Sequence, residues 1–166
     1  MNAPAQAFGS WRHIFGSLML AVLLEQFPWS GWALALRPDF VLVGVLFWVL
    51  YQPARIGFGV AFFLGLLADF QDGVVFGQHA IAYALGVYLV LFLRLRLLQF
   101  DPLRMAAQMF PVFLAVQLVV LLAGWLAINP PDNLAILYPV LGSTLLWYLL
   151  TGFLRLWHGK SLQDRT

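Results

Sequence analysis

The sequence predicts an all-α fold, a polytopic membrane bundle of six transmembrane helices in one domain. Of the 166 residues, 63% are hydrophobic and only 10% carry a charge, whereas a soluble domain averages about 25% charged residues. The apolar residues fall into six runs, and turn-forming residues separate the runs. The chain therefore lacks the polar surface that a water-soluble domain needs, and the lipid bilayer is its expected surroundings.

The first three predicted spans are separated by short turns that contain proline. Span one covers residues 14–32 and ends before Arg37-Pro38-Asp39, since proline disfavours a continuing helix. Span two covers residues 40–51, Pro53 interrupts it, and span three covers residues 56–70. Spans two and three are shorter than the roughly 20 residues that cross a bilayer. An alternative with four spans, in which these two form a re-entrant pair, therefore stays open.

The last three predicted spans cover residues 79–93, 109–128 and 135–157. A basic connector from Arg94 to Arg104 joins the first two, and its Asp101-Pro102 pair is typical of a helix start. A run of asparagine, proline and aspartate separates the last two. With the first three spans, these give an even number of crossings and place both ends of the chain on one side.

The charges predict which side that is. If the N-terminus is cytoplasmic, all of the nine cations except Arg37 lie in inner segments, which is a strong positive-inside pattern. We expect an inner-membrane protein with cytoplasmic tails at residues 1–13 and 158–166 around a transmembrane domain of residues 14–157. Although Ala33-Leu34-Ala35 imitates a signal-peptide cleavage site, the apolar run before it is long, and we expect it to stay as a span.

Composition also excludes several classes of function. The cations are too few and too scattered for a nucleic-acid-binding patch. The absence of cysteine excludes disulfides and thiolate chemistry. The three histidines are isolated, and the metal-binding spacings HExxH and CxxC do not occur. We therefore expect no nucleic-acid partner, no metal and no cofactor.

A stripe of small residues is the most informative local pattern. Gly57, Ala61 and Gly65 are four residues apart, so they share one helical face on which another helix can approach closely. Asp69 is the next position on that face, and lipid cannot solvate its carboxylate. We therefore favour packing of this stripe inside the bundle. The alternative is that the stripe receives the single helix of a partner.

Asp69 is followed by a glycine-rich turn, and Gly77-Gln78-His79 opens the next helix. His79 shares a face with Tyr83 by i,i+4 spacing, and in one interpretation it forms a hydrogen bond with Asp69. The alternative is a histidine at the membrane interface that only begins a helix. Asp72-Gly73 is a turn signal and needs no further role.

Glu25 and Arg37 are candidates for a second polar contact. Glu25 lies well inside predicted span one, where an ionised carboxylate is costly unless it is paired. Arg37 is the one cation expected on the outer side. A Glu25–Arg37 or Asp69–Arg37 network would fix the outer half of the bundle or bind a polar group. In the alternative interpretation, Arg37 and Asp39 are interfacial anchors beside two nearby tryptophans.

Four short motifs follow one another along the chain, and their order and spacing are informative. They are Arg37-Pro38-Asp39-Phe40, Pro53-x-Arg55-x-Gly57, Phe63-Leu64-Gly65-Leu66-Leu67-Ala68-Asp69 and Gly73-x-x-x-Gly77-Gln78-His79-Ala80. With this order and spacing, residues 14–157 resemble the MreD family of bacterial rod shape-determining membrane proteins. The residues at matching motif positions are expected to be structural or partner-binding, namely Arg37, Pro38, Asp39, Arg55, Gly65, Asp69, Gly77 and His79.

The resemblance implies a fold similar to the six-helix substrate-binding subunits of energy-coupling-factor transporters. It also implies a non-enzymatic scaffold in the elongation machinery of rod-shaped bacteria. The implied direct partner is the bitopic protein MreC, and the indirect partners are MreB, RodA and a class B penicillin-binding transpeptidase. The family supplies no catalytic residue that could be carried over.

Two other functions compete with the scaffold. A transport-related binding module would have a periplasm-facing cavity lined by Glu25, Arg37, Asp69 and His79. An intramembrane lipid enzyme would need clustered histidines, acids or serines on facing helices, whereas the acids here are spread over different segments. The sequence and the resemblance together favour a scaffold that regulates cell shape.

Overall fold

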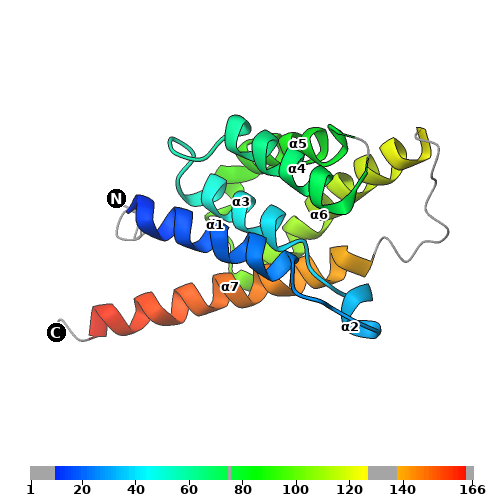
Figure 1. Cartoon of the computed structure of the whole chain (residues 1–166). Helices are drawn as coiled ribbons and strands as arrows, with labels where there is room; N and C mark the ends of the chain where they lie inside the picture. Colours follow the sequence, from blue (N-terminus) through cyan, green and yellow to red (C-terminus); the bar gives the residue numbers. More distant parts are fainter. Residues whose placement is uncertain (1–9, 75, 127–137, 164–166) are drawn as a thin grey trace.

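The computed structural model describes residues 10–74, 76–126 and 138–163, and every regular element in these ranges is a helix (Figure 1). The helices are α1 (Trp11–Glu25), α2 (Trp32–Ala35), α3 (Phe40–Tyr51), α4 (Phe58–Asp72), α5 (Gln78–Leu97), α6 (Pro102–Leu126) and α7 (Tyr138–Gln163). The all-α prediction is therefore confirmed. Apart from the short α2, these helices pack as a bundle.

Helix α3 lies at the centre of the bundle, where it contacts α1, α4, α5 and α7. Its sequence carries no charged residue, and a helix that is apolar all round is normally buried. Most of its side chains are indeed buried, from Val41 at one end to Leu50 at the other. Because neighbouring helices cover it, α3 can be only 12 residues long without exposing backbone ends to lipid.

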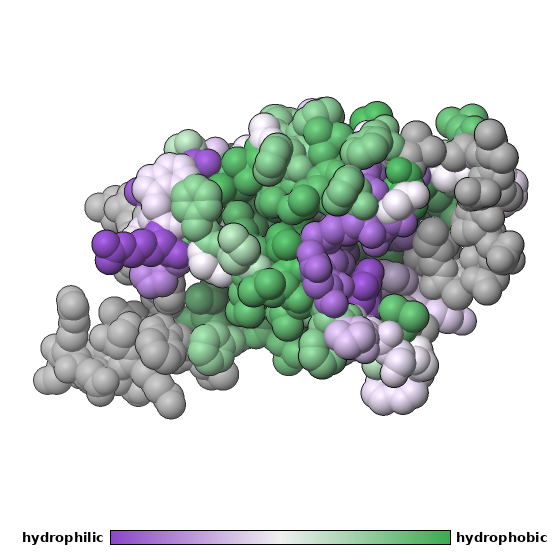
Figure 2. Space-filling view, viewed as in Figure 1, coloured by the Kyte–Doolittle hydropathy of each residue, from purple (hydrophilic) through white to green (hydrophobic). Residues whose placement is uncertain are grey.

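Helices α5 and α6 are the two described helices that are long and apolar enough to cross a bilayer. They contain 20 and 25 residues, and much of their surface is apolar and exposed, including Ile81, Phe92 and Leu122. Figure 2 shows a broad apolar band over one face of the bundle, with hydrophilic patches toward its two ends. The count of six spans, the division at residues 14–157 and the orientation stay predictions.

Helix α1 ends at Glu25, whereas the sequence analysis extended the first span to Trp32. Pro28 explains the early end, because proline disfavours the helical conformation of the residue before it. The freed carbonyl of Leu24 accepts a hydrogen bond from the indole N–H of Trp29 (3.0 Å). Glu25 is thus the last residue of its helix, and the prediction that it lies deep inside a span was wrong.

The basic connector between α5 and α6 is also shorter than expected. Arg94 and Arg96 belong to the last turn of α5, where positive charges are favoured by the helix dipole. Arg104 already lies in α6, which begins at Pro102 rather than at Met109 because proline fits the first position of a helix. The expected ends at 128 and 135 lie outside the described residues.

The two ends of the bundle differ in charge. One end, which we call the basic end, holds the start of α1, the α3–α4 turn, the α5–α6 turn and the end of α7 (Figure 1). It carries the described arginines other than Arg37, namely Arg12, Arg55, Arg94, Arg96, Arg104 and Arg155. The other end, the acidic end, carries Glu25, Arg37, Asp39, Asp69 and Asp72.

Candidate functional site

Asp69 closes the α4–α5 hairpin at the acidic end. Its carboxylate is fully buried and accepts hydrogen bonds from the backbone N–H groups of Gly77 (2.8 Å) and His79 (2.7 Å). The Nδ1 atom of His79 lies 2.9 Å from the same carboxylate. Asp69 therefore caps the N-terminus of α5 from the neighbouring helix, a place where the helix dipole favours a negative charge.

His79 links Asp69 to the second acid of the hairpin. Its Nε2 atom lies 3.9 Å from the Asp72 carboxylate, and the imidazole ring makes an edge contact with Tyr83, with ring centres 6.0 Å apart. The contact of His79 with Tyr83 agrees with their i,i+4 spacing. Its contact with Asp69 agrees with the interpretation in which these two residues form a hydrogen bond. A protonated His79 would have an acid opposite each ring nitrogen, and so would join the end of α4 to the start of α5.

Gly65 brings the backbones of α4 and α5 into direct contact. A Cβ atom at this position would lie only 2.5 Å from Ala80 Cα and 2.7 Å from Ala80 N. Ala61, one turn earlier, is fully buried. The small-residue stripe thus packs inside this protein, and Ala61 and Gly65 are not free to receive the helix of a partner.

Gly57 does not belong to this stripe, contrary to the sequence analysis. Its backbone is extended (φ −147°, ψ −157°), it precedes the first residue of α4, and a Cβ atom there would meet nothing within 4 Å. The helix starts later than expected because residues 52–56 reverse the chain after α3. Gly77, by contrast, needs glycine, since its φ of +100° is left-handed.

Asp39 connects three helices at the same end of the bundle. It is the N-cap of α3 and accepts a hydrogen bond from the N–H of Leu42 (2.7 Å). The buried Tyr83 hydroxyl of α5 lies 2.7 and 2.8 Å from its two carboxylate oxygens. The backbone N–H of Asp39 donates to Ser143 Oγ of α7 (3.0 Å).

Glu25 and Arg37 join the end of α1 to the start of α3. Their charged groups lie 3.7 Å apart, and Arg37 also donates to the backbone carbonyl of Glu25 (3.2 Å). Glu25 accepts a further hydrogen bond from the N–H of Phe40 (3.1 Å). Of the two networks proposed for Arg37, the described contacts form the one with Glu25 and not the one with Asp69.

Pro38 lies where α7 packs against the segment before α3. A Cβ atom on Gly142 would fall 2.1 Å from the carbonyl oxygen of Leu36 and 3.2 Å from Pro38 N. Gly142 was not among the predicted site residues. Its only signal in the sequence is a glycine within an apolar helix, and a single sequence does not show which segment that helix contacts.

Arg55 lies at the basic end, as does Gly57 in the same turn between α3 and α4. The guanidinium of Arg55 stacks over the ring of Trp11, 5.6 Å from the ring centre. The remaining motif residues gather at the acidic end as two neighbouring clusters, one around Asp39 and Glu25 and the other around Asp69. The functional role of each residue stays a prediction, because geometry alone does not test it.

The hydrogen bonds of the acidic end join neighbouring helices. Each of its buried carboxylates accepts hydrogen bonds from a neighbouring helix end or from Tyr83. In the described part of the chain, no group of three or more histidines, acids or cysteines is arranged to hold a metal ion. The cavity described below is not lined by Glu25, Arg37, Asp69 or His79.

These features define a helical membrane protein whose buried polar groups serve helix packing. Within that class the chain belongs to the MreD family, because the family model for rod shape-determining protein MreD matches residues 7–157. The resemblance found in the sequence is thereby confirmed, and the protein is a membrane protein of the rod-shape machinery.

A similar relative is the rod shape-determining protein MreD of Haemophilus influenzae, which is 31% identical over 80 residues. This match covers 48% of the present chain and 49% of the relative, so it spans about half the length of that protein. No solved structure matches the chain. The similarity to energy-coupling-factor subunits consequently stays a prediction from the family resemblance.

Proposed function

We propose that this protein is a non-enzymatic scaffold of the cell-elongation machinery in the bacterial inner membrane. In this role it links an MreC-like protein and the cytoplasmic MreB filament to peptidoglycan synthesis, and so regulates cell shape. The observation that carries the proposal is the pairing of the buried carboxylates with helix ends. Membership of the MreD family supports it further.

The direct partner in this proposal is an MreC-like bitopic membrane protein. RodA and a class B penicillin-binding transpeptidase are indirect partners, which this protein contacts only through the MreC-like protein. Because Gly65 packs against α5 and Ala61 is fully buried, we place the docking surface for the partner helix elsewhere on the bundle. Helix α1 is one such surface, since Phe15, Met19 and Leu23 are exposed along it.

The proposed orientation places both termini and the basic end in the cytoplasm. The described arginines other than Arg37 support this, because cytoplasmic loops carry an excess of arginine and lysine. Reporter fusions test it directly. A reporter active only in the periplasm should be silent after Leu97 and after the C-terminus, and active when inserted after Gly73. The reverse pattern would overturn the orientation.

Co-purification in detergent tests the scaffold itself. The full chain and a tagged MreC-like protein should elute as one complex. A variant with both Arg37→Ala and Asp69→Ala should lose the complex if the acidic end shapes the docking surface. Asp72→Ala is the matched control, because this side chain is 45% exposed and its ion-pair distance to His79 is long, at 3.9 Å. Absence of a wild-type complex with any elongation protein would contradict the proposal.

A further inference from the structure

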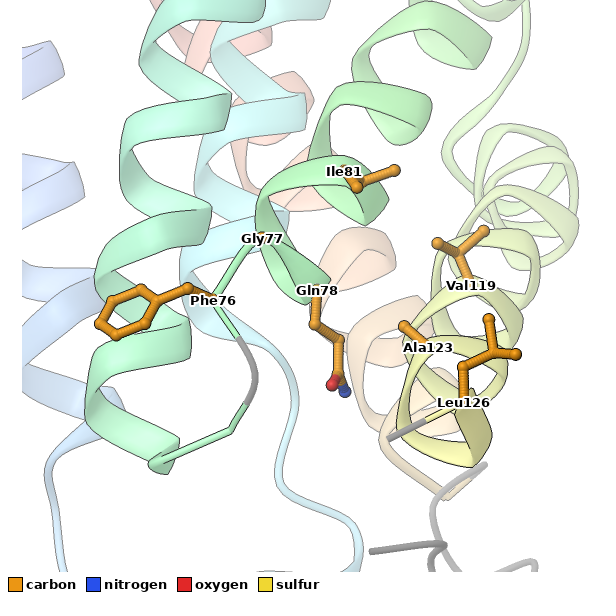
Figure 3. A pocket seen from close by; sticks show the side chains of 7 residues that line it. All are labelled: Phe76, Gly77, Gln78, Ile81, Val119, Ala123 and Leu126. Carbon is orange, nitrogen blue, oxygen red and sulfur yellow. The ribbon is translucent and has the colours of Figure 1, made fainter. Parts of the chain in front are cut away.

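An open cavity of about 290 Å³ lies between the start of α5 and the end of α6 (Figure 3). Among the described residues its lining is apolar except for one amide side chain, and these residues are Phe76, Gly77, Gln78, Ile81, Val119, Ala123 and Leu126. Val119, Ala123 and Leu126 share one face of α6, since they are four and three residues apart. The small side chain of Ala123 leaves the space opposite Gln78 open.

Gln78 is the unusual member of this lining. It is only 8% exposed, and its side chain projects from the first turn of α5 into the gap beside Ala123 (Figure 3). In the ranges that the structure describes, its amide group makes no hydrogen bond, and the amide reaches the open cavity. The amide offers two N–H donors and one carbonyl acceptor to an occupant of the cavity.

The length of α5 fixes the depth at which Gln78 lies. The 20 residues from Gln78 to Leu97 rise about 30 Å at ~1.5 Å per residue, which equals the thickness of the hydrocarbon core of a bilayer. Arg94 and Arg96, in the last turn, can reach the headgroups on the opposite side. Gln78 thus falls where hydrocarbon gives way to the ester groups of the lipids.

We propose that this groove binds one acyl chain of a membrane phospholipid. The chain lies against Ile81 and the Val119–Leu126 face of α6, and its ester carbonyl accepts a hydrogen bond from the Gln78 amide. An apolar groove with one amide side chain at ester depth fits an apolar chain that begins with a carbonyl group, because an amide N–H can donate to that carbonyl.

A partner helix fits the same groove less well. Its backbone carbonyls are already bonded within the helix, so it would leave the Gln78 amide unpaired unless it also supplied a polar side chain. A water molecule could form hydrogen bonds with the amide, but it would make no favourable contact with the apolar side chains of the groove. The phospholipid supplies both an apolar chain for the wall and a carbonyl acceptor for an N–H of the Gln78 amide.

Native mass spectrometry of the full chain in detergent tests this proposal. The probes are dioleoylphosphatidylethanolamine and its dialkyl ether analogue, which lacks the ester carbonyls. We expect the wild type to bind the ester lipid about five-fold more tightly, a ratio that corresponds to about 1 kcal/mol for one hydrogen bond. Gln78→Leu should bind both lipids equally.

Filling the groove gives a second readout. Ala123→Phe should weaken binding of both lipids at least ten-fold, whereas Ala107→Phe, on an exposed part of the same helix, should leave binding unchanged. Equal binding of ester and ether lipids to the wild type would overturn the proposal, as would wild-type affinity in a folded Ala123→Phe variant. If Ala123→Phe does not fold, the ester–ether comparison on the wild type decides alone. No partner protein is needed, so the result is independent of the scaffold role.

Discussion

The acidic and basic ends of the bundle differ in whether their charged side chains are buried or exposed. At the acidic end, the carboxylates of Asp39 and Asp69 lie inside the protein and cap the N-termini of α3 and α5. At the basic end, Arg155 and Asp101 pair at 2.9 Å while 47% and 71% of their side chains are exposed. A short carboxylate can be buried wherever helix N–H groups converge on it, whereas arginine keeps its charged group near water.

The acidic end contributes more to helix packing than the basic end does. At the acidic end, hydrogen bonds of the carboxylates join one helix to another. Asp39 contacts Tyr83 of α5 and Ser143 of α7, and Asp69 of α4 contacts the start of α5. The basic end makes fewer buried contacts, one being the bond from Arg94 Nε to the carbonyl of Leu50 (2.9 Å). We expect substitutions at the acidic end to change stability and substitutions at the basic end mainly to affect orientation.

The largest effect is expected for Asp69→Leu. The substitution leaves the N–H groups of Gly77 and His79 and the His79 ring without their acceptor, and loss of one partner of a buried charged contact costs about 3–5 kcal/mol. Unfolding in mixed detergent micelles measures this loss, and rod-shape complementation should fail with it. Asp72→Leu should cost far less. Equal tolerance of both substitutions in either assay would refute the placement of Asp69.

A smaller loss, about 3 kcal/mol, is expected for Gly65→Ala. The new methyl group would overlap backbone atoms of Ala80, which cannot rotate away, so the cost is near the upper end of that for overpacking. Gly59→Ala on the same helix is the matched control, since a Cβ atom there meets nothing within 4 Å. Thermal melting of both variants should separate them by several degrees. Identical melting would show that α4 and α5 lie farther apart.

Tyr83→Phe removes the hydroxyl donor to Asp39 and should cost about 2 kcal/mol, the usual contribution of a hydrogen bond to a charged group. Tyr88→Phe serves as control, because Tyr88 is exposed on the same helix. The same unfolding assay measures both variants. A neutral Tyr83→Phe would indicate that Asp39 is held by the N–H of Leu42 alone.

The smallest effect is expected at the basic end. Arg155→Ala should lower the free energy of unfolding by less than about 1 kcal/mol, because both partners of its ion pair are well exposed. Added salt should remove even that difference. If Arg155→Ala were as damaging as Asp69→Leu, the contrast between the two ends would be wrong.

The local parts of this structure were predictable from the sequence, and the long-range parts were not. The range of α3 was predicted correctly, since Asp39 and Pro53 mark its ends. The Asp69–His79 contact joins residues only ten apart within one hairpin. The Asp39–Tyr83 and Asp39–Ser143 contacts span 44 and 104 residues, and a single sequence does not say which helices are neighbours.

The wrong predictions concern helix ends at which two sequence signals conflicted. The apolar residues after Glu25 favoured a longer first helix, but Pro28 ended it. Gly57 fitted the periodicity of α4, yet it lies in the turn that precedes the helix. Both errors concern helix ends, where periodicity carries little information.

The separation of Asp39 from Ser143 has a consequence for how the protein is made. A ribosome releases the chain from its N-terminus, so the α4–α5 hairpin can close on Asp69 while later helices are still being synthesised. Asp39 receives Tyr83 with the arrival of α5, but its contact with α7 must wait for Ser143, 104 residues further on. Packing of α7 therefore completes the acidic end. A chain truncated before α7 would enter the membrane without the hydrogen bond between Asp39 and Ser143.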